Sequence, residues 1–260
     1  MAWTRRYDDP EPQRVNRWLA QSGVCSRREA EALIARGLVT IDGVRVDDPG
    51  RKIEAGQTLT LADEAATSLD AALTVVIHKP VGVVSAHPEP GQVPAVRLLT
   101  REALWGETGA APGPDGRLAP VGRLDRDSRG LLILSEDGVV AKAVIGPASE
   151  LDKEYLVRVT GAVTPRKLAL LRRGLRLDGR TLKLARVTEV EGGRLRFVLN
   201  EGRNRQIRRM CELVDLQVTD LLRTRIGPLK LGDLPEGGWR PLRSDERVAL
   251  LKASVGAVPA

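Results

Sequence analysis

One short segment of the chain places an acid and a cation side by side where a strand is expected to end. Residues 121–138 read VGRLDRDSRGLLILSEDG, in which an Arg-Leu-Asp turn at Arg123 and Asp125 follows a short strand. The apolar run Leu131–Leu134 comes next and is expected to form a buried strand, closed by an Asp-Gly turn signal. A buried strand behind the turn would hold this carboxylate still, as a reactive group requires. Asp127 is the rival acid in the same turn.

This segment resembles the signature loop of bacterial ribosomal RNA pseudouridine synthases of the RsuA and RluB group. In that family the Asp of the GRLD motif is catalytic, so the resemblance implies that Asp125 is the nucleophile of a uridine isomerisation. The reaction involves no net redox change, and the chain has no phosphate-binding loop or metal-spaced cluster, so we expect no cofactor and no metal. Because the target base must leave the stack, Arg123 is expected to bind substrate by filling the vacated space or stacking its guanidinium against it.

Two further segments resemble motifs of the same family. HKPVG, from residue 78, resembles the first motif, with His78 where Asn is common, and Lys79 is predicted to bind substrate. The alternative is that His78 and Lys79 only make structural contacts at the end of a strand. The alternating segment KEYLVRV places Tyr155 where the family has a tyrosine against the target base. The resemblance makes this residue catalytic, as a candidate for removing the C5 proton; otherwise it is a half-buried strand tyrosine.

The segment EGRNRQIRRM, at residues 201–210, resembles the third motif, in which the Arg after Gln-Ile pairs with the catalytic acid. The resemblance therefore implies that Arg208 is catalytic beside Asp125, and it places Ile207 in the substrate site. The surrounding sequence has a clear excess of basic over acidic residues. This positive charge favours RNA binding, and the alternative is a basic helix that only faces solvent. Three more arginines here are predicted to bind RNA: Arg203, Arg205 and Arg209.

Residues 14–61 resemble a second family, the RNA-binding domain named for ribosomal protein S4. Two short helices are expected, the second beginning with a capping box at Ser26 and Glu29, and a hairpin with an Asp-Gly turn follows. In that family the second helix and its start meet RNA. The alternative is a solvated helix face, since basic residues barely outnumber acidic ones here. The residues predicted to bind RNA are Arg17, Ser26, Arg27 and Arg28.

The remaining boundaries come from local pattern. Residues 1–13 are polar and expected to form a flexible tail, and residues 254–260 form another. Residues 62–73 lack an apolar period and are predicted to be a linker. The catalytic domain then spans residues 74–253. The expected fold class is α+β, with a small S4-like domain of helices and strands and a larger mixed, mainly antiparallel sheet of the type that the resemblance implies.

Composition limits the partners and the compartment. The 260 residues carry a formal net charge of +7, which favours a polyanionic partner. Cys25 and Cys211 lie too far apart for a metal or redox motif, and both are expected to be buried. No apolar run approaches the ~18 residues of a membrane span, and no signal core is seen. A cytoplasmic monomer without membrane contact is therefore expected.

Taken together, the motifs predict site-specific isomerisation of uridine to pseudouridine in ribosomal RNA. Large-subunit (23S) RNA is favoured, because Arg205 and the later segment RTRIGPLKLGDLPEGGWRPL resemble that branch of the family. Two alternatives stay open: a non-catalytic RNA-binding factor in ribosome assembly, and a pseudouridine synthase that acts on small-subunit or transfer RNA. A DNA-binding regulator is disfavoured, since no recognition-helix pattern appears.

Overall fold

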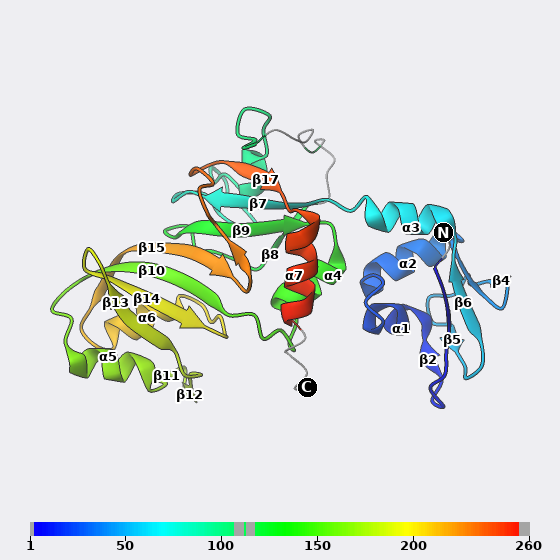
Figure 1. Cartoon of the computed structure of the whole chain (residues 1–260), viewed down its shortest axis with the longest axis horizontal. Coiled ribbons are helices and arrows are strands. Elements are labelled where there is room, and N and C mark those ends of the chain that lie inside the picture. Colours follow the sequence, from blue (N-terminus) through cyan, green and yellow to red (C-terminus); the bar gives the residue numbers. More distant parts are fainter. Residues whose placement is uncertain (1–2, 107–111, 113–117, 255–260) are drawn as a thin grey trace. The chain divides into compact units, whose positions relative to one another are not determined.

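The chain folds into two compact units, each built around its own sheet (Figure 1). The structure is a computed structural model that describes residues 3–106, 112 and 118–254. The first unit comprises Met1–Leu73 and Ser135–Lys142, and the second comprises Thr74–Leu134 and Ala143–Ala260. Among the residues that the structure describes, no helix has both the length and the apolar character needed to cross a membrane.

The first unit combines a small sheet with short helices. Its four-stranded sheet has the order β1-β6-β3-β4, with every neighbouring pair antiparallel. The strands are β1 (Thr4–Arg6), β2 (Gln13–Arg14), β3 (Val39–Ile41), β4 (Val44–Arg45), β5 (Lys52–Ile53) and β6 (Thr58–Leu61), of which β2 pairs only with β5. The helices are α1 (Val15–Gln21), α2 (Arg27–Ala35), α3 (Asp63–Asp70) and the start of α4 (Gly138–Ile145).

Local signals in this unit act as predicted. The Ser26 side chain accepts a hydrogen bond from the backbone N of Glu29 at 3.2 Å, and the Glu29 carboxylate accepts one from the backbone N of Ser26. This is the capping box that starts α2. Strands β3 and β4 form the expected hairpin, whose turn residues Asp42 and Gly43 have φ values of 50° and 79°. Both residues therefore take the left-handed conformation that such a turn requires.

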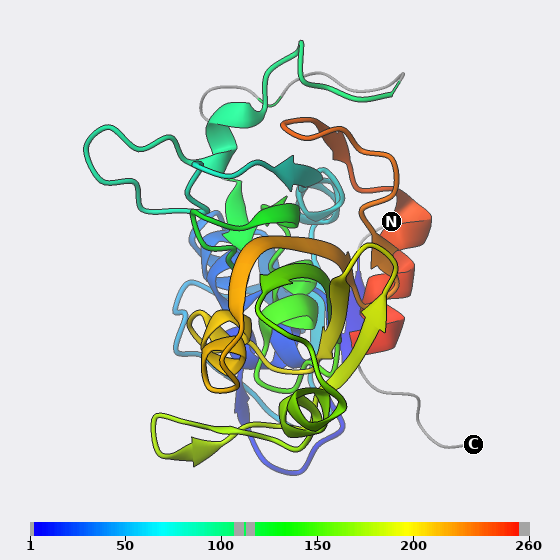
Figure 2. The same cartoon turned by 90° about the vertical axis from the view of Figure 1, so that its left-hand side faces the viewer.

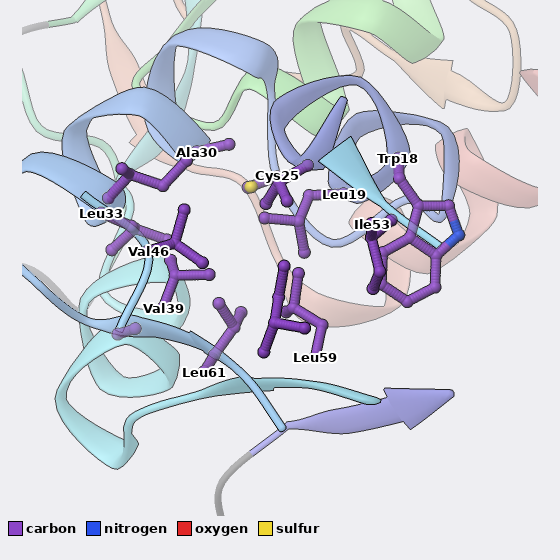
Figure 3. Close-up of a cluster of buried hydrophobic side chains, with 14 of the residues drawn as sticks. Trp18, Leu19, Cys25, Ala30, Leu33, Val39, Val46, Ile53, Leu59 and Leu61 are labelled. Atoms are coloured by element: carbon purple, nitrogen blue, oxygen red, sulfur yellow. The ribbon is translucent and has the colours of Figure 1, made fainter. Parts of the chain in front are cut away.

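Two boundary predictions for this unit are wrong. The predicted tail of residues 1–13 contains β1, which pairs with β6, and Tyr7, which packs edge-on against Trp18 with ring centroids 5.3 Å apart. The predicted linker of residues 62–73 contains α3, in which Ala65 is fully buried. Figure 3 shows the core that these additions complete, formed by side chains such as Leu19 of α1 and by residues from the strands. Both errors arise because the partners of these segments are distant in sequence.

The second unit is built on a nine-stranded sheet with the main order β13-β14-β10-β15-β9-β7-β17, to which β8 and β16 are added through β9 and β15. The strands are β7 (Thr74–Lys79), β8 (Ala119–Val121), β9 (Arg129–Ser135), β10 (Lys153–Thr160), β13 (Arg186–Val190), β14 (Arg194–Leu199), β15 (Gln217–Ile226), β16 (Leu229–Lys230) and β17 (Trp239–Pro241). Strands β9 and β15 run parallel, whereas the β10, β13 and β14 pairings are antiparallel. This mixed sheet confirms the predicted α+β class.

Helices and a small hairpin connect the strands. They are a 3-10 helix (Ala95–Leu98), α5 (Pro165–Arg172), the hairpin of β11 (Arg176–Leu177) and β12 (Arg180–Thr181), α6 (Gln206–Glu212) and α7 (Ser244–Ser254). Figure 2 shows β15 beside β10, and the β11–β12 hairpin extending away from the sheet. Helix α5 begins with a cap, because the Thr164 side chain accepts a hydrogen bond from the backbone N of Lys167. Of the C-terminal tail predicted for residues 254–260, only Ser254 lies among the described residues, and it ends α7.

Burial follows the predicted alternation in β10. Tyr155 and Val157 are buried, whereas Arg158 is exposed. Cys211 is buried within α6, and Cys25 is buried in the first unit, as expected. The Asp-Gly pair at residues 137–138 is not a turn after β9: the Asp137 side chain accepts hydrogen bonds from the backbone N of Val139 and of Val140, in the first turn of α4. The sequence pattern of a turn and that of a helix cap are alike at this point.

Candidate active site

A pocket of about 640 Å³ lies in the second unit, within the size range of ligand-binding sites. Its walls come from the loop after β8, from β10, from the segment that leads into α6, and from β15. Most residues that the sequence singled out in this unit line it. They are Arg123, Asp125, Tyr155, Arg203, Arg205, Ile207 and Arg208. Lys79 and Arg209 do not belong to the lining.

The loop that carries Asp125 is held from one side by Ser85. The Ser85 hydroxyl donates to the carbonyl of Leu124 at 2.7 Å and accepts from the backbone N of Leu124 at 2.9 Å. The backbone N of Ser128 then donates to the carbonyl of Asp125 at 3.1 Å, which closes the turn. Ser85 and Leu124 are both buried, so these bonds are shielded from water. The residue preceding the candidate nucleophile is thus fixed by a hydroxyl group that the sequence did not single out.

A second set of bonds joins the same two loops. The backbone N of Gly82 donates to the carbonyl of Arg126 at 2.8 Å, and the Arg126 Nε donates back to the carbonyl of Gly82 at 3.2 Å. Gly82 has a φ of 90°, a conformation that L side chains rarely adopt. The HKPVG segment therefore acts as a support for the GRLD loop.

Arg223 of β15 supports the loop from the other side. Its Nε donates to the carbonyl of Leu131 at 2.8 Å and its Nη1 to the carbonyl of Arg123 at 3.2 Å, so it grips the chain before and after Asp125. The residue is 3% exposed, and its Nη2 has no hydrogen-bond partner within the described part of the chain. Only the register of the sheet reveals this role, since nothing in the local sequence around Arg223 indicates it.

The predicted pairing of Arg208 with Asp125 is wrong: Arg208 contacts the rival acid instead. Its Nε lies 3.3 Å from Asp127 Oδ2, and its Nη2 donates to the Asp127 carbonyl at 2.7 Å and to the Ser128 hydroxyl at 3.2 Å. The cation nearest to Asp125 is Arg205, whose Nη1 lies 3.9 Å from Asp125 Oδ2 and 3.0 Å from Asp127 Oδ2. The cause is the turn itself, which directs the two carboxylates differently. About a third of the Asp125 side chain stays exposed to the pocket.

Tyr155 shares the pocket with Asp125, and its catalytic role stays a prediction. It lines the pocket, is 8% exposed, and stands opposite Arg223 in the β10–β15 register. Lys153, two residues earlier, also lines the pocket. Burial lowers the pKa of Lys153, and the Arg223 charge adds to this effect, whereas Asp152 opposes it. The inner wall of the pocket therefore combines an aromatic ring with cations, a surface suited to a base and an adjacent phosphate.

The predicted substrate contact of Lys79 is wrong. The side chain is fully buried, and its Nζ donates to the carbonyls of Pro80 and Val83, each at 2.7 Å. Burial lowers the pKa of Lys79 to about 8, although the Asp127 and Asp125 charges oppose the shift. Lys79 thus shapes the supporting loop from within, because a buried ammonium group needs carbonyl partners at close range.

Two of the arginines predicted to bind RNA hold the β11–β12 hairpin. Arg203 donates to the carbonyls of Leu177 and Thr181, at 3.3 and 3.0 Å. Arg209 makes two bonds to the Asp178 carboxylate, at 2.9 and 2.6 Å, and this guanidinium lowers the pKa of Asp178. Both guanidinium groups therefore have protein partners, so RNA contact through their free faces stays a prediction.

The predicted RNA contacts in the first unit lie at its surface. Arg17, Arg27 and Arg28 are exposed, and the first two line a second pocket of about 630 Å³ together with Arg14 and Lys52. The Ser26 hydroxyl accepts the cap bond, so its proton is still available to a phosphate. RNA binding by these four residues stays a prediction. Within the described ranges, no cluster of three or more His, Cys, Asp or Glu is arranged to hold a metal ion.

Comparison with known proteins gives two family matches. A family model described as RNA pseudouridylate synthase matches residues 73–213, and the S4 domain model matches residues 13–59. The dual-specificity RNA pseudouridine synthase RluF of Escherichia coli (strain K12) is 32% identical over 241 residues, which cover 92% of this chain and 78% of that protein. An uncharacterized RNA pseudouridine synthase of Mycobacterium tuberculosis (strain ATCC 25618 / H37Rv) is 35% identical over 259 residues, covering 97% and 98%. A crystal structure of a pseudouridylate synthase is 25% identical, covers 91% of this chain and 99% of that chain, and superposes with a TM-score of 0.63.

Proposed function

This chain belongs to the RNA pseudouridylate synthase family, and we propose that it isomerises uridine in ribosomal RNA with Asp125 as the nucleophile. The observation that carries the proposal is the position of Asp125 in the pocket. Asp125 is partly exposed in a pocket of suitable size, and its loop is gripped by Ser85 on one side and Arg223 on the other. Such a rigid support is what a reactive carboxylate requires.

The lining residues suggest a role for each group. The Asp125 carboxylate acts on the flipped nucleotide while the bond from N1 to the ribose breaks, the base turns within the pocket, and C5 then joins the ribose. The Tyr155 ring lies against the base, and its hydroxyl is the candidate to relay the proton that leaves C5, while N1, freed from the ribose, ends the reaction with a proton. Ile207 is 4% exposed and packs beside the base, while Arg123 fills or stacks against the space that the nucleotide leaves. Arg205 supplies the positive charge closest to the reacting carboxylate.

Ribosomal RNA is favoured as the substrate because an S4-type unit accompanies the pocket. Exposed Arg17, Arg27 and Arg28 would hold folded RNA through its phosphates and its shape. Of the two ribosomal subunits, we propose the RNA of the large one as the target. We further propose that it acts as a monomer. Because ribosomal RNA is made and assembled in the bacterial cytoplasm, we propose that the enzyme works there.

Release of tritium from ribosomal RNA labelled at uridine C5 tests the proposal. Wild-type protein should release tritium, and Asp125→Asn should reduce the rate by at least about 1,000-fold, because an amide cannot act as the nucleophile. Binding of the RNA should change little. The matched control is Asp233→Asn, which alters an exposed aspartate outside the pocket lining. An active Asp125→Asn variant would remove this residue from the mechanism.

The alternatives give different results. A non-catalytic assembly factor would support ribosome formation equally well with Asp125→Ala, and the wild type would release no tritium. An enzyme acting on small-subunit or transfer RNA would release tritium from those RNAs. Mapping which uridine loses its modification in cells that lack the protein would identify the substrate in each case.

A further inference from the structure

Three arginines lie on the face of the second unit's sheet that is opposite the pocket: Arg158 of β10, and Arg194 and Arg196 of β14. Neighbouring residues of a strand point to opposite faces. Tyr155 on β10 and Leu199 on β14 line the pocket, so the arginines, which have the other parity, point away from it. Arg158 and Arg196 are exposed, and Arg194 is half-buried.

The strand register brings these three charges together. Arg158 stands directly opposite Arg194, and Arg196 stands opposite Leu156, two residues along the same face. Directly opposite side chains have Cβ atoms about 5 Å apart, and the diagonal neighbours about 7–8 Å. Like charges that face each other in this way destabilise an antiparallel pair. The pairing therefore costs stability in the isolated protein, and an anion placed over it would reverse that effect.

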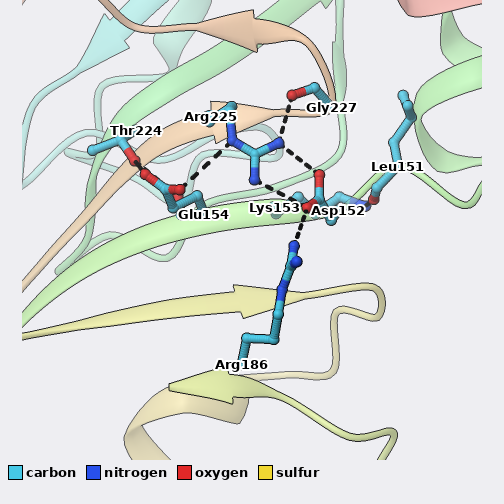
Figure 4. A network of polar contacts seen from close by, with 8 residues as sticks. All are labelled: Leu151, Asp152, Lys153, Glu154, Arg186, Thr224, Arg225 and Gly227. Carbon is cyan, nitrogen blue, oxygen red and sulfur yellow. Dashed lines mark hydrogen bonds and ion pairs between the residues drawn. The ribbon is translucent and has the colours of Figure 1, made fainter. Parts of the chain in front are cut away.

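Other cations on the same face have acidic partners. Asp152 accepts hydrogen bonds from Arg225 at 2.6 and 3.0 Å and from Arg186 at 3.1 Å, and Glu154 lies 3.7 Å from Arg225 (Figure 4). These groups neutralise one another at that end of the face, and the two guanidiniums lower the pKa of Asp152.

At the end of the face where the three arginines lie, Asp220 is the acid opposite Arg158 in the register. Both Asp220 oxygens are already bound by Arg129, at 2.8 Å each. In the part of the chain that the structure describes, none of the three arginines has a carboxylate within ion-pair distance. Their charge is therefore available to an outside partner.

We propose that Arg158, Arg194 and Arg196 form a second RNA-binding surface, which contacts the phosphate backbone of ribosomal RNA away from the target uridine. The proposal rests on the proposed function, because it assumes an RNA substrate. Guanidinium groups suit phosphates, both in geometry and through release of counterions. The aromatic residues of these two strands, Tyr155 and Phe197, lie on the other face, so this surface offers no aromatic ring for base stacking. It therefore contributes to affinity and orientation rather than to sequence reading.

The position of the surface has a consequence for the substrate. A short stem-loop that fills the pocket cannot also reach the opposite face of the sheet. A long, folded RNA can contact both faces. The three arginines should therefore matter for long ribosomal RNA fragments and be dispensable for a minimal stem-loop.

The test compares Arg158→Gln/Arg194→Gln/Arg196→Gln with a control that loses the same charge elsewhere, Arg101→Gln/Arg166→Gln/Arg173→Gln, all at exposed positions. The Kd is measured against KCl concentration for a long ribosomal RNA fragment and for a stem-loop that supports turnover. Each lost phosphate contact should lower the slope of log Kd against log salt by about 0.9. We expect a decrease of about two to three for the long fragment, and stem-loop turnover within about twofold of wild type. The control triple should keep the wild-type slope.

Three outcomes would overturn the proposal. A slope equal to that of the control triple would show that the face does not meet RNA. Normal binding to protein-free RNA with weakened binding to intact ribosomal subunits would assign the face to an acidic ribosomal protein. A loss of stem-loop turnover by a variant with a wild-type thermal midpoint would place the arginines in the catalytic machinery. Failure of the proposed function is distinguishable, because wild-type protein would then release no tritium from any RNA.

Discussion

Asp125 and Asp127 belong to one turn, yet their surroundings give them different tasks. Arg208 binds both the side chain and the carbonyl of Asp127, so that residue helps to hold the turn together. Within the described residues, Arg205 is the cation in ion-pair distance of Asp125, at 3.9 Å, and about a third of the Asp125 side chain stays open to the pocket. The bracing of one carboxylate leaves the other available to the substrate. We therefore expect Arg208 to act on the reaction by fixing the loop.

This division predicts how Arg208→Ala will behave. Removing the side chain leaves the part-buried Asp127 carbonyl and the buried Ser128 hydroxyl without this donor, which is expected to cost about 1–3 kcal/mol of stability. The loop then shifts, and a misplacement of about 1 Å is expected to lower kcat by about 100-fold. The Kd for RNA should stay within about threefold of wild type. Stopped-flow turnover and filter binding measure the two effects, with Arg173→Ala as the control. A defect confined to Kd would instead make Arg208 a phosphate contact.

At the scale of elements, the site depends on the close parallel approach of β9 and β15. Gly130 of β9 pairs with Arg223 of β15, and a Cβ added at residue 130 would lie 2.4 Å from the Arg223 carbonyl oxygen. Its φ of 113° lies in the region reserved for glycine. The glycine that follows the GRLD turn therefore lets Arg223 reach the loop that carries Asp125.

Gly130→Ala should reduce both stability and activity. The strain and the clash together are expected to cost about 2–4 kcal/mol, and relief of the clash would pull Arg223 away from its carbonyl partners. Gly232→Ala is the matched control, since Gly232 has a φ of 59° with no atom within 4 Å of an added Cβ. It should cost about 1–2 kcal/mol and leave kcat unchanged. Thermal unfolding and tritium release compare the pair. Equal effects of the two substitutions would contradict the role of the close approach.

Asp152 ties three strands together and makes their stability dependent on pH. Hydrogen bonds from Arg225, with the charge of Arg186 nearby, lower its pKa in the folded state. A lowered carboxyl pKa gives stability that is present above the unfolded value of about 3.9 and is lost as pH falls through the folded value. Asp152→Asn should therefore destabilise the protein by about 1–3 kcal/mol at pH 7. Urea unfolding at several pH values should show the gap between variant and wild type closing below about pH 4. A gap that stays constant down to pH 2.5 would mean that the charge is irrelevant.

Elements whose formation depends on residues close in sequence could be predicted. Elements that form by pairing with segments far away in the sequence could not. The Ser26 capping box and the alternation around Tyr155 depend on spacings of two or three residues, and both appear in the structure. Strand β1 pairs with β6 more than fifty residues later, so its polar sequence predicted a tail. The partner of Arg208 was assigned to the wrong acid for a related reason. Side-chain direction within a turn depends on supports such as Ser85, which come from another loop.

For the whole molecule, the chain carries two compact units and each contains its own buried core. The predicted catalytic residues Asp125, Tyr155 and Arg208 all lie in the second unit, and none lies in the first. The predicted RNA contacts are divided between the units. Binding and turnover should therefore separate when the chain is cut, and the salt dependence of binding should show which unit supplies the phosphate contacts.

A chain that begins at Thr74 tests this separation. It keeps β7 and every residue that lines the pocket, so it should fold and release tritium from a short stem-loop. Its thermal midpoint should fall, because residues 135–142 cluster with the part that is removed. Loss of Arg17, Arg27 and Arg28 should weaken binding to ribosomal RNA and lower the salt slope by about two to three. Arg17→Gln/Arg27→Gln/Arg28→Gln in the full-length chain is the matched control and should reproduce the change in slope without the change in midpoint. An unaltered slope in both proteins would mean that the first unit holds the substrate by something other than these phosphate contacts.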